Sequence, residues 1–200
     1  MPQQLVDLDA LDLSKTLYGK DDFHRVLRQR GTFSLLDGVL HLGDDGEVVA
    51  YKDIRADEWW AADHIPGRPI FPGVLMVEAS AQLGTFDFFI RRPDFESKFV
   101  GFTGIDKIRF RATVEPDCRL LFVAKVKRVR NMMFTYACQG VVDGNIVFDG
   151  ELTGMALCAD ALDGPDRRRA RSPERSSRSV KGPVSPVWKR GEALDTDCAE

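Results

Sequence analysis

The spacing of apolar residues changes several times along the chain, and each change predicts an element. Short strand-like runs lie at residues 39–42 and 48–54, and the Gly43-Asp44-Asp45-Gly46 segment between them is typical of a turn, so a hairpin is predicted. A helix is predicted at about residues 73–89, where Leu, Met, Ala and Gln are frequent and apolar residues lie on almost every side. This pattern indicates a helix that is buried in the core.

After Pro93 the pattern returns to strands. They are expected at residues 99–104, 105–114, 119–130, 134–143 and 145–156, and Asp143-Gly144 is a strong hairpin signal between the last two. A hairpin, one buried helix and a meander of long strands predict an α+β fold in which an antiparallel β-sheet wraps around a long central helix. This layout is that of a hot-dog fold.

Composition sets the expected domain limits. A chain of 200 residues, 44% of them hydrophobic, has room for one apolar core. We expect an N-terminal arm at residues 1–20, the folded domain at 21–158 and a basic Ser/Arg/Pro-rich tail at 159–200. Because the tail has Arg167-Arg168-Arg169 and few large apolar residues, it is expected to be disordered. An acidic partner or RNA could bind it, but a solvated appendage is the simpler interpretation.

Charge and patterning exclude several classes of function. The formal net charge of −3 predicts neither a nucleic-acid partner nor an anionic membrane partner. Residues 1–16 hold three aspartates and only Lys15 as a cation, which is unlike a signal peptide. Glu78, Gln82 and Asp87 interrupt the longest apolar stretch, so no membrane span is predicted. A cytoplasmic location is expected.

Metal and disulfide chemistry are not expected either. The histidines and cysteines show no metal-ligand spacing and no close cysteine pair, so no metal site is predicted and the cysteines are expected to be free thiols. These residues are His24, His41, His64, Cys118, Cys138, Cys158 and Cys198.

The segment from residue 64 to residue 82 combines groups that acid–base chemistry needs. Prolines and glycines between His64 and Gly73 predict a rigid loop that holds the imidazole in place. Gly73 begins the predicted helix, so its N–H is an unpaired donor that can polarise a substrate carbonyl group. Glu78 lies about one turn further along, and Gln82 one turn beyond it could orient the carboxyl group by a hydrogen bond.

Each of these residues has a simpler explanation when taken alone. His64 could be a loop histidine with its hydrogen bonds satisfied, and Glu78 could pair with an arginine at a subunit contact. The two groups together, with a Pro/Gly scaffold and helix-start donors between them, favour a catalytic site.

The same segment resembles the signature of the beta-hydroxyacyl-acyl-carrier-protein dehydratases of the FabZ/FabA type. That signature reads roughly H-F-P-G-x-P, then x-P-G-V-L and E-A-x-A-Q. A looser similarity covers residues 23–157. The matching positions are His64, Pro66, Gly67, Pro69, Pro72, Gly73, Val74, Leu75, Glu78, Ala79, Ala81 and Gln82.

The resemblance implies a reaction and a set of site residues. His64 and Glu78 would be the catalytic pair that converts a 3-hydroxyacyl thioester to a trans-2-enoyl thioester in fatty acid or related lipid or polyketide biosynthesis. Pro72, Gly73, Val74 and Gln82 would bind the substrate. Glu at position 78, where the isomerising branch has Asp, favours the FabZ-like branch. The implied active unit is a homodimer, either alone or as part of a trimer of dimers, in which His64 of one subunit faces Glu78 of the other.

The resemblance implies an acyl carrier protein as the partner. No cofactor is expected, because the substrate carries its own phosphopantetheine. Lys107, Arg109 and Arg111 alternate along one predicted strand, so they would share a face suited to this acidic partner. A solvated strand face without a partner explains the same pattern.

Some positions depart from the family pattern. Asp63 replaces the usual Gly before the histidine, and a carboxylate there favours imidazolium, which is a poor base. Ile65 replaces the usual Phe, which alters the expected acyl tunnel. Two other functions therefore stay open: a hot-dog thioesterase that uses Glu78, and an acyl-thioester binding protein without turnover.

Overall fold

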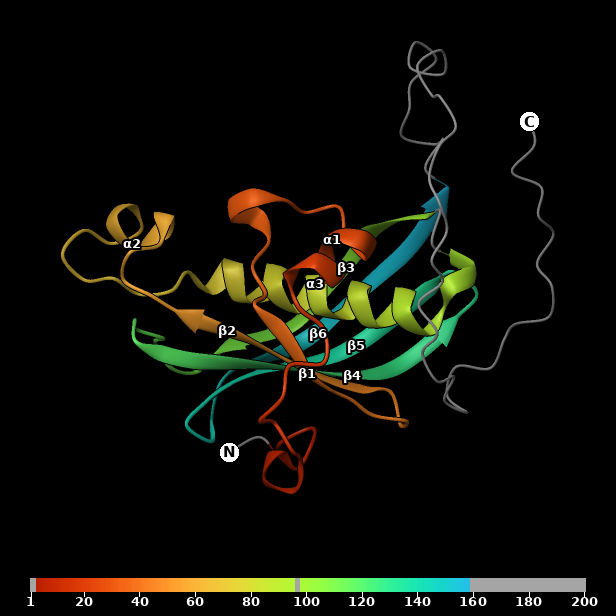
Figure 1. Ribbon diagram of the computed structural model, residues 1–200, viewed down its shortest axis with the longest axis horizontal. Coiled ribbons are helices and arrows are strands. Elements are labelled where there is room, and N and C mark those ends of the chain that lie inside the picture. The colour runs from red at the N-terminus through yellow and green to blue at the C-terminus, as the bar shows by residue number, and fades with distance from the viewer. Residues whose placement is uncertain (1–2, 96–97, 159–200) are drawn as a thin grey trace, which may run out of the picture.

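A six-stranded antiparallel sheet wraps around one long helix in the computed structural model, which describes residues 3–95 and 98–158 (Figure 1). The strand order is β1-β2-β4-β5-β6-β3, so β1 and β3 are the sheet edges. The strands are β1 (Gly38–Leu42), β2 (Glu47–Ile54), β3 (Lys98–Phe110), β4 (Cys118–Arg130), β5 (Met133–Val142) and β6 (Asn145–Cys158). The helices are α1 (Lys20–Val26), α2 (Trp59–Asp63) and α3 (Gly73–Arg91), with short 3-10 turns at Leu8–Ala10, Gly31–Phe33 and Pro93–Phe95.

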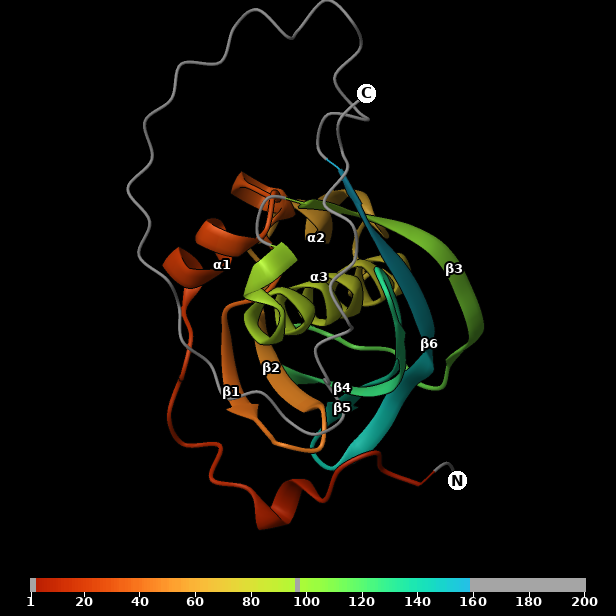
Figure 2. The ribbon, with the colours of Figure 1, turned by 90° about the vertical axis from the view of Figure 1, so that its right-hand side faces the viewer.

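The predicted fold class is confirmed: the architecture is α+β, with the sheet curved around α3 (Figure 2). The hairpin of β1 and β2 and the hairpin of β5 and β6 lie where the turn residues predict them. The predicted central helix is also present and runs two residues further, to Arg91.

One strand prediction was wrong. The two strands expected at residues 99–104 and 105–114 are the single strand β3, which ends at Phe110. Its register against β6 shifts between Phe102 and Gly104 and again between Asp106 and Arg109. Such irregularities bend a strand without ending its pairing. The alternation of apolar and polar residues is interrupted at these positions. The sequence therefore predicts two strands where the structure has one.

Helix α3 is the core of the fold. Fourteen of its residues are buried, and they pack against the inner face of the sheet and against α1, where Phe23 meets Phe86 in an edge-on ring contact. By length and apolar composition alone α3 could span a membrane, but 67% of that window is buried inside the protein. Burial on all sides by its own sheet and loops explains the apolar composition.

Residues 5–13 of the N-terminal arm lie on the other side of the sheet from α3 (Figure 1). The apolar side chains of this segment pack against a second, smaller cluster that contains Val49, Val123 and Val141. The division into arm, domain and tail at residues 20 and 158 stays a prediction, and the tail lies outside the described residues.

Candidate active site

The loop before α3 holds His64 through its own backbone. His64 follows the short helix α2 and donates its N–H to the Trp60 carbonyl at 2.9 Å. Its ring Nδ1 lies 2.8 Å from the Ile70 carbonyl oxygen. A carbonyl can only accept, so Nδ1 carries a proton, and in the neutral ring the lone pair is on Nε2. The solvent-exposed imidazole is therefore oriented with Nε2 available as a base.

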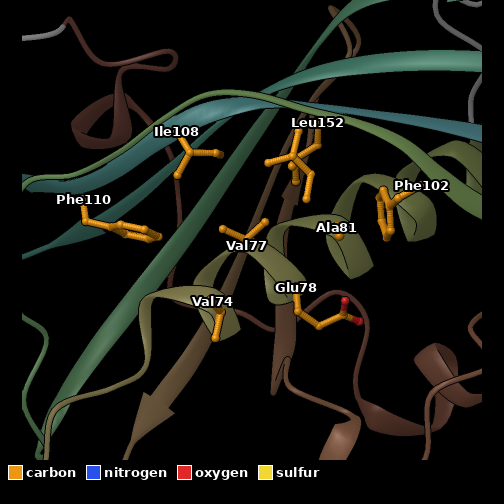
Figure 3. A pocket seen from close by; sticks show the side chains of 9 residues that line it. Val74, Val77, Glu78, Ala81, Phe102, Ile108, Phe110 and Leu152 are labelled. Atoms are coloured by element: carbon orange, nitrogen blue, oxygen red, sulfur yellow. The ribbon is translucent and has the colours of Figure 1, made fainter.

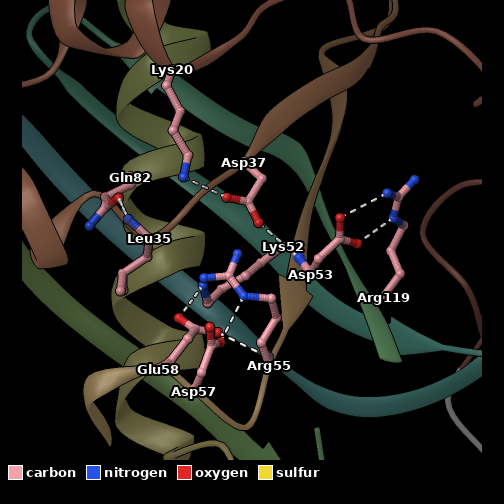
Figure 4. A network of polar contacts seen from close by, with 10 residues as sticks. All are labelled: Lys20, Leu35, Asp37, Lys52, Asp53, Arg55, Asp57, Glu58, Gln82 and Arg119. Atoms are coloured by element: carbon pink, nitrogen blue, oxygen red, sulfur yellow. Dashed lines mark hydrogen bonds and ion pairs between the residues drawn. The ribbon is translucent and has the colours of Figure 1, made fainter. Parts of the chain in front are cut away.

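Buried anchors fix both ends of this loop. The Trp60 and Phe71 rings pack edge to face, 5.2 Å between centroids, and both are fully buried. The Phe71 N–H donates to the Val114 carbonyl at 2.7 Å. At the start of α2, Glu58 pairs with Lys52 of β2 at 2.6 Å, and this pair belongs to the polar network of Figure 4. The loop is thus tied to the core on both sides of His64.

The first turn of α3 presents unpaired donors. Pro72 is the N-cap, and its carbonyl accepts the N–H groups of Leu75 and Met76. Within the described part of the chain, the N–H groups of Gly73 and Val74 have no hydrogen-bond acceptor. A Cβ at position 73 would lie 2.8 Å from the Phe110 ring, so a larger residue there would have to push this half-exposed ring aside. The geometry thus provides two free donors at the positive end of a long helix.

Glu78 is held by two glutamine amides. Gln82 Nε2 donates to Glu78 Oε1 at 2.9 Å, which confirms the hydrogen bond expected from the sequence. Gln29, which the sequence analysis missed, donates to the same oxygen at 3.3 Å. Since Oε1 already accepts two N–H groups, a proton on this carboxyl group belongs on Oε2, which has no partner among the described residues.

Gln82 is itself locked in place. Its Oε1 accepts the Leu35 N–H at 3.1 Å, and its Nε2 also donates to the Phe33 carbonyl at 2.8 Å. Figure 4 shows the first of these bonds beside the Lys20–Asp37 ion pair. The segment before β1 therefore positions Gln82, and Gln82 positions Glu78. No local sequence signal marks Gln29 or Leu35, because both lie more than 40 residues away from their partners in α3.

A cavity of about 390 Å³ lies between α3 and β3 (Figure 3). Among the described residues, Glu78 is the only charged one that lines it. The size falls in the range of small-molecule sites, and an apolar lining with one ionisable group suits an acyl chain with a reactive end. The other lining residues are Val74, Val77, Ala81, Phe102, Ile105, Ile108, Phe110 and Leu152.

His64 and Glu78 do not meet within one chain. Neither a hydrogen bond nor an ion pair joins them in the described ranges, and His64 is exposed and does not line the cavity. Asp63 likewise forms no ion pair with His64 in these ranges. The structure places Pro72, Gly73, Val74, Glu78 and Gln82 along the N-terminal half of α3, and it leaves the imidazole outside this group.

Lys107, Arg109 and Arg111 were predicted to alternate along one strand, and the structure shows that they do not. The register of β3 shifts at Lys107, whose φ is 55°, and Arg111 lies beyond the strand end. Lys107 pairs with Glu151 at 2.8 Å and Arg111 pairs with Asp149, so two of the three charges are partly neutralised within the chain. Contact with a carrier protein at these residues stays a prediction.

The sheet, the central helix and the cavity together define a hot-dog-fold protein with a candidate acid–base site. Among solved structures, the dehydratase heterocomplex ApeI:P from Xenorhabdus doucetiae superposes with a TM-score of 0.60 at 17% identity, covering 70% of this chain and 93% of that one. An HP0420 homologue from Helicobacter felis gives a TM-score of 0.51 at 13% identity, covering 66% and 86%. At these identities the likeness concerns the fold.

Sequence comparison identifies the family. The FabA-like domain model matches residues 27–151. The 3-hydroxyacyl-[acyl-carrier-protein] dehydratase FabZ of Herpetosiphon aurantiacus is 35% identical over 132 residues, 66% of this chain and 93% of the relative. The protein with this name in Campylobacter jejuni is 38% identical over 135 residues, 66% and 92% of the two chains. The chain belongs to the FabA-like family, on its FabZ-like branch.

Proposed function

We propose that this protein dehydrates 3-hydroxyacyl thioesters, presented by an acyl carrier protein, to trans-2-enoyl thioesters in fatty acid biosynthesis. The observation that carries the proposal is the environment of Glu78. It is the one charged group among the described residues that line an apolar cavity, its Oε1 is occupied by glutamine donors, and free helix-start N–H groups lie about one turn away. The FabZ relatives have the same activity in their names.

The free N–H groups at the start of α3 and the apolar lining of the cavity suggest how the substrate would bind. The thioester carbonyl accepts a hydrogen bond from the N–H of Gly73 or Val74, and this bond strengthens as negative charge develops on the oxygen. The acyl chain would lie along the apolar wall formed by α3, β3 and β6, beside Val77, Ala81 and Leu152. The 3-hydroxyl group then lies beside Glu78.

Two proton transfers complete the reaction. His64 Nε2 removes a proton from the α-carbon, whose acidity depends on the polarised carbonyl. The C3–O bond breaks, and Glu78 Oε2 donates its proton to the departing hydroxyl, directly or through a water molecule, so that water is released. The product is the enoyl thioester with imidazolium and carboxylate, and the proton returns from His64 to Glu78 through water.

The proposed active unit is a homodimer. β3 is an edge strand, and its Phe102, Ile105 and Phe110 side chains are 41%, 59% and 52% exposed. An edge with unpaired backbone groups and large apolar side chains favours pairing with another chain. Such pairing would cover the open side of the cavity and would bring His64 of the partner subunit to Glu78.

No metal or organic cofactor is needed for this chemistry, because the substrate carries its own phosphopantetheine. We expect turnover to be unchanged after treatment with a chelator. The acyl carrier protein as donor and the cytoplasm as location are part of the proposal.

Product analysis tests the reaction. The purified full chain is incubated with 3-hydroxybutyryl- and 3-hydroxydecanoyl-acyl carrier protein, and the products are measured by intact mass. Loss of one water from the carrier-bound acyl group supports dehydration. Free hydroxy acid with free carrier thiol would instead establish a thioesterase, and unchanged substrate in the presence of binding would establish a protein without turnover.

Mixed dimers test the shared site. His64→Ala and Glu78→Gln chains are each inactive under the proposal, but a dimer with one chain of each type has one intact His64–Glu78 pair. We expect mixing by co-expression to restore about a quarter of wild-type activity if subunits pair at random and each intact pair works alone. Absence of any restoration in a verified mixed dimer would refute the shared site.

A further inference from the structure

Gly150 lies in the middle of strand β6, and its backbone does not require glycine. Its φ is not positive, so any residue could adopt this conformation. Glycine weakens the interior of a strand, because it loses more conformational freedom on folding than other residues and packs no side chain. A glycine in such a place often marks a close approach of another part of the chain. The reason for glycine at position 150 is therefore to be found in its neighbours.

The neighbour is Ile108, at a bulge in the adjacent strand β3. Between two register pairs, β3 has two residues, Lys107 and Ile108, where β6 has only Gly150. This is the pattern of a β-bulge, and the φ of Lys107, 55°, marks the bend. The Lys107 ammonium group is held by the Glu151 carboxylate at 2.8 Å. The bulge thus brings Ile108 close to Gly150.

Glycine leaves the space that the Ile108 side chain occupies. A Cβ at position 150 would overlap Cδ1 of Ile108 and would lie 3.2 Å from its Cα and Cγ1. Ile108 packs against the core and also lines the cavity between α3 and β3, whereas Gly150 does not line this cavity. A side chain at position 150 would therefore push Ile108 away from β6 and into the cavity.

Ile108 stands where an acyl chain would have to pass. Figure 3 shows it on the strand side of the cavity, between Phe110 and Leu152, with Val77 on the helix side. In the proposed reaction the thioester carbonyl binds at the start of α3 and the 3-hydroxyl lies beside Glu78. A butyryl chain ends one carbon beyond that hydroxyl, whereas a longer chain continues through the apolar part of the cavity past Ile108.

We propose that Gly150 is a positioning residue that determines acyl-chain specificity: by leaving room for Ile108, it keeps the cavity wide enough for 3-hydroxyacyl chains much longer than butyryl. Gly150 acts through Ile108 and does not touch the substrate. The inference deepens the proposed function and rests on it for the orientation of the substrate. It makes the bulge of β3 and the glycine opposite it one device that sets the width of the cavity.

Gly150→Ala in the full chain tests the proposal, and Gly154→Ala is the matched control. Both glycines are buried in β6, but a Cβ at position 154 would lie 2.5 Å from the Phe134 ring, which does not line the cavity. Steady-state kinetics give kcat/KM for 3-hydroxydecanoyl- and 3-hydroxybutyryl-acyl carrier protein. We expect Gly150→Ala to lower the decanoyl-to-butyryl ratio at least about tenfold, as one methylene group can in an apolar pocket, and Gly154→Ala to change it less than about twofold.

Ile108→Val provides the rescue, because it deletes Cδ1, the atom that a Cβ at position 150 would overlap. In this background Gly150→Ala should change the ratio less than about twofold. Ile108→Phe narrows the same part of the cavity and leaves β6 intact, so it should lower the ratio as Gly150→Ala does. Circular dichroism checks folding. If Gly150→Ala alone does not fold, the double variant with Ile108→Val must fold, and Ile108→Phe then tests the cavity.

Binding separates this inference from the proposed function. Decanoyl- and butyryl-pantetheine amides, in which nitrogen replaces the thioester sulfur, have no 3-hydroxyl group and cannot be dehydrated, and calorimetry gives their Kd values. Wild type should prefer the decanoyl amide, and Gly150→Ala should lose this preference, even if no substrate is turned over. Absence of turnover with these binding results intact would count against dehydration alone.

Four results would overturn the role of Gly150. They are a wild type without preference for the decanoyl amide, a wild-type preference that Gly150→Ala or Ile108→Phe keeps, an equal loss in Gly154→Ala, and an effect of Gly150→Ala that Ile108→Val does not reduce. A double variant that fails to fold counts with the last of these, because position 150 would then need glycine for a reason other than Ile108.

Discussion

Gln82 connects the stability of the fold to the chemistry of Glu78, and its replacement by leucine separates the two. Gln82→Leu keeps a similar side-chain size but removes the hydrogen bonds to Glu78, to the Phe33 carbonyl and from the Leu35 N–H. Gln82 is 1% exposed and Leu35 is 2% exposed, so the Leu35 N–H is left buried without an acceptor. A buried unsatisfied group costs about 1–3 kcal/mol, and the lost bond to Phe33 adds about 1 kcal/mol. We therefore expect the free energy of unfolding to fall by about 2–4 kcal/mol.

The catalytic effect has a different signature. Without the amide of Gln82, Glu78 loses its shorter hydrogen bond, so its carboxyl group is less well positioned for proton transfer. We expect kcat to fall about 10- to 100-fold, as for other residues that orient a reacting group. KM should change little, because Gln82 does not line the cavity.

Urea unfolding and steady-state kinetics measure the two effects on the same preparation. Gln29→Leu is the matched control: it removes only the 3.3 Å bond to Glu78 and strands no backbone group, so it should cost less than about 1 kcal/mol. Equal unfolding midpoints for Gln82→Leu and wild type, or equal losses in the two variants, would refute this reasoning.

Three other perturbations test separate parts of the structure. Gly73→Ala puts a Cβ against the Phe110 ring, so it should lower kcat/KM. The loss should be smaller when Phe110→Leu is also present, and equal losses in this double-mutant cycle would argue against the contact. Burial, and next the charge of Asp87, raise the pKa of Tyr136 well above its usual value. Since the neutral phenol is the folded form, wild-type stability should fall as pH rises above about 10, and Tyr136→Phe should flatten this decline in alkaline urea titrations. Burial raises the pKa of the Cys138 thiol to about 12, so iodoacetamide should leave Cys138 unmodified at pH 8 until the protein unfolds; rapid native labelling would contradict its burial.

The fold could be predicted because its signals are local. Turn residues mark both hairpins, and the apolar run of α3 gives the central helix almost to its last residue. The division of β3 failed for a local reason too, since a register shift near Gly104 interrupts the alternation that defines a strand. The helix α2 was missed because five residues are too few for a helical period.

The site was only partly predictable. Gly73, Glu78 and Gln82 share one helix, so their spacing predicts that Gln82 reaches Glu78. Gln29 is brought to Glu78 by the tertiary fold, and no spacing in the sequence marks it. The ion pairs of Lys107 and Arg111 with β6 depend on strand pairing over about 40 residues, and the sequence gives no register for that pairing.

The most direct test of the account is the turnover of 3-hydroxyacyl-acyl carrier protein by wild type, His64→Ala and Glu78→Gln, with the enoyl product followed by absorbance. Circular dichroism confirms that each variant is folded, and Asp63→Asn is the control next to His64. The account predicts that kcat falls about 10²- to 10⁴-fold in both variants, because each loses one proton-transfer group. Turnover within about tenfold of wild type in either variant would contradict the assignment of His64 and Glu78 as the catalytic pair.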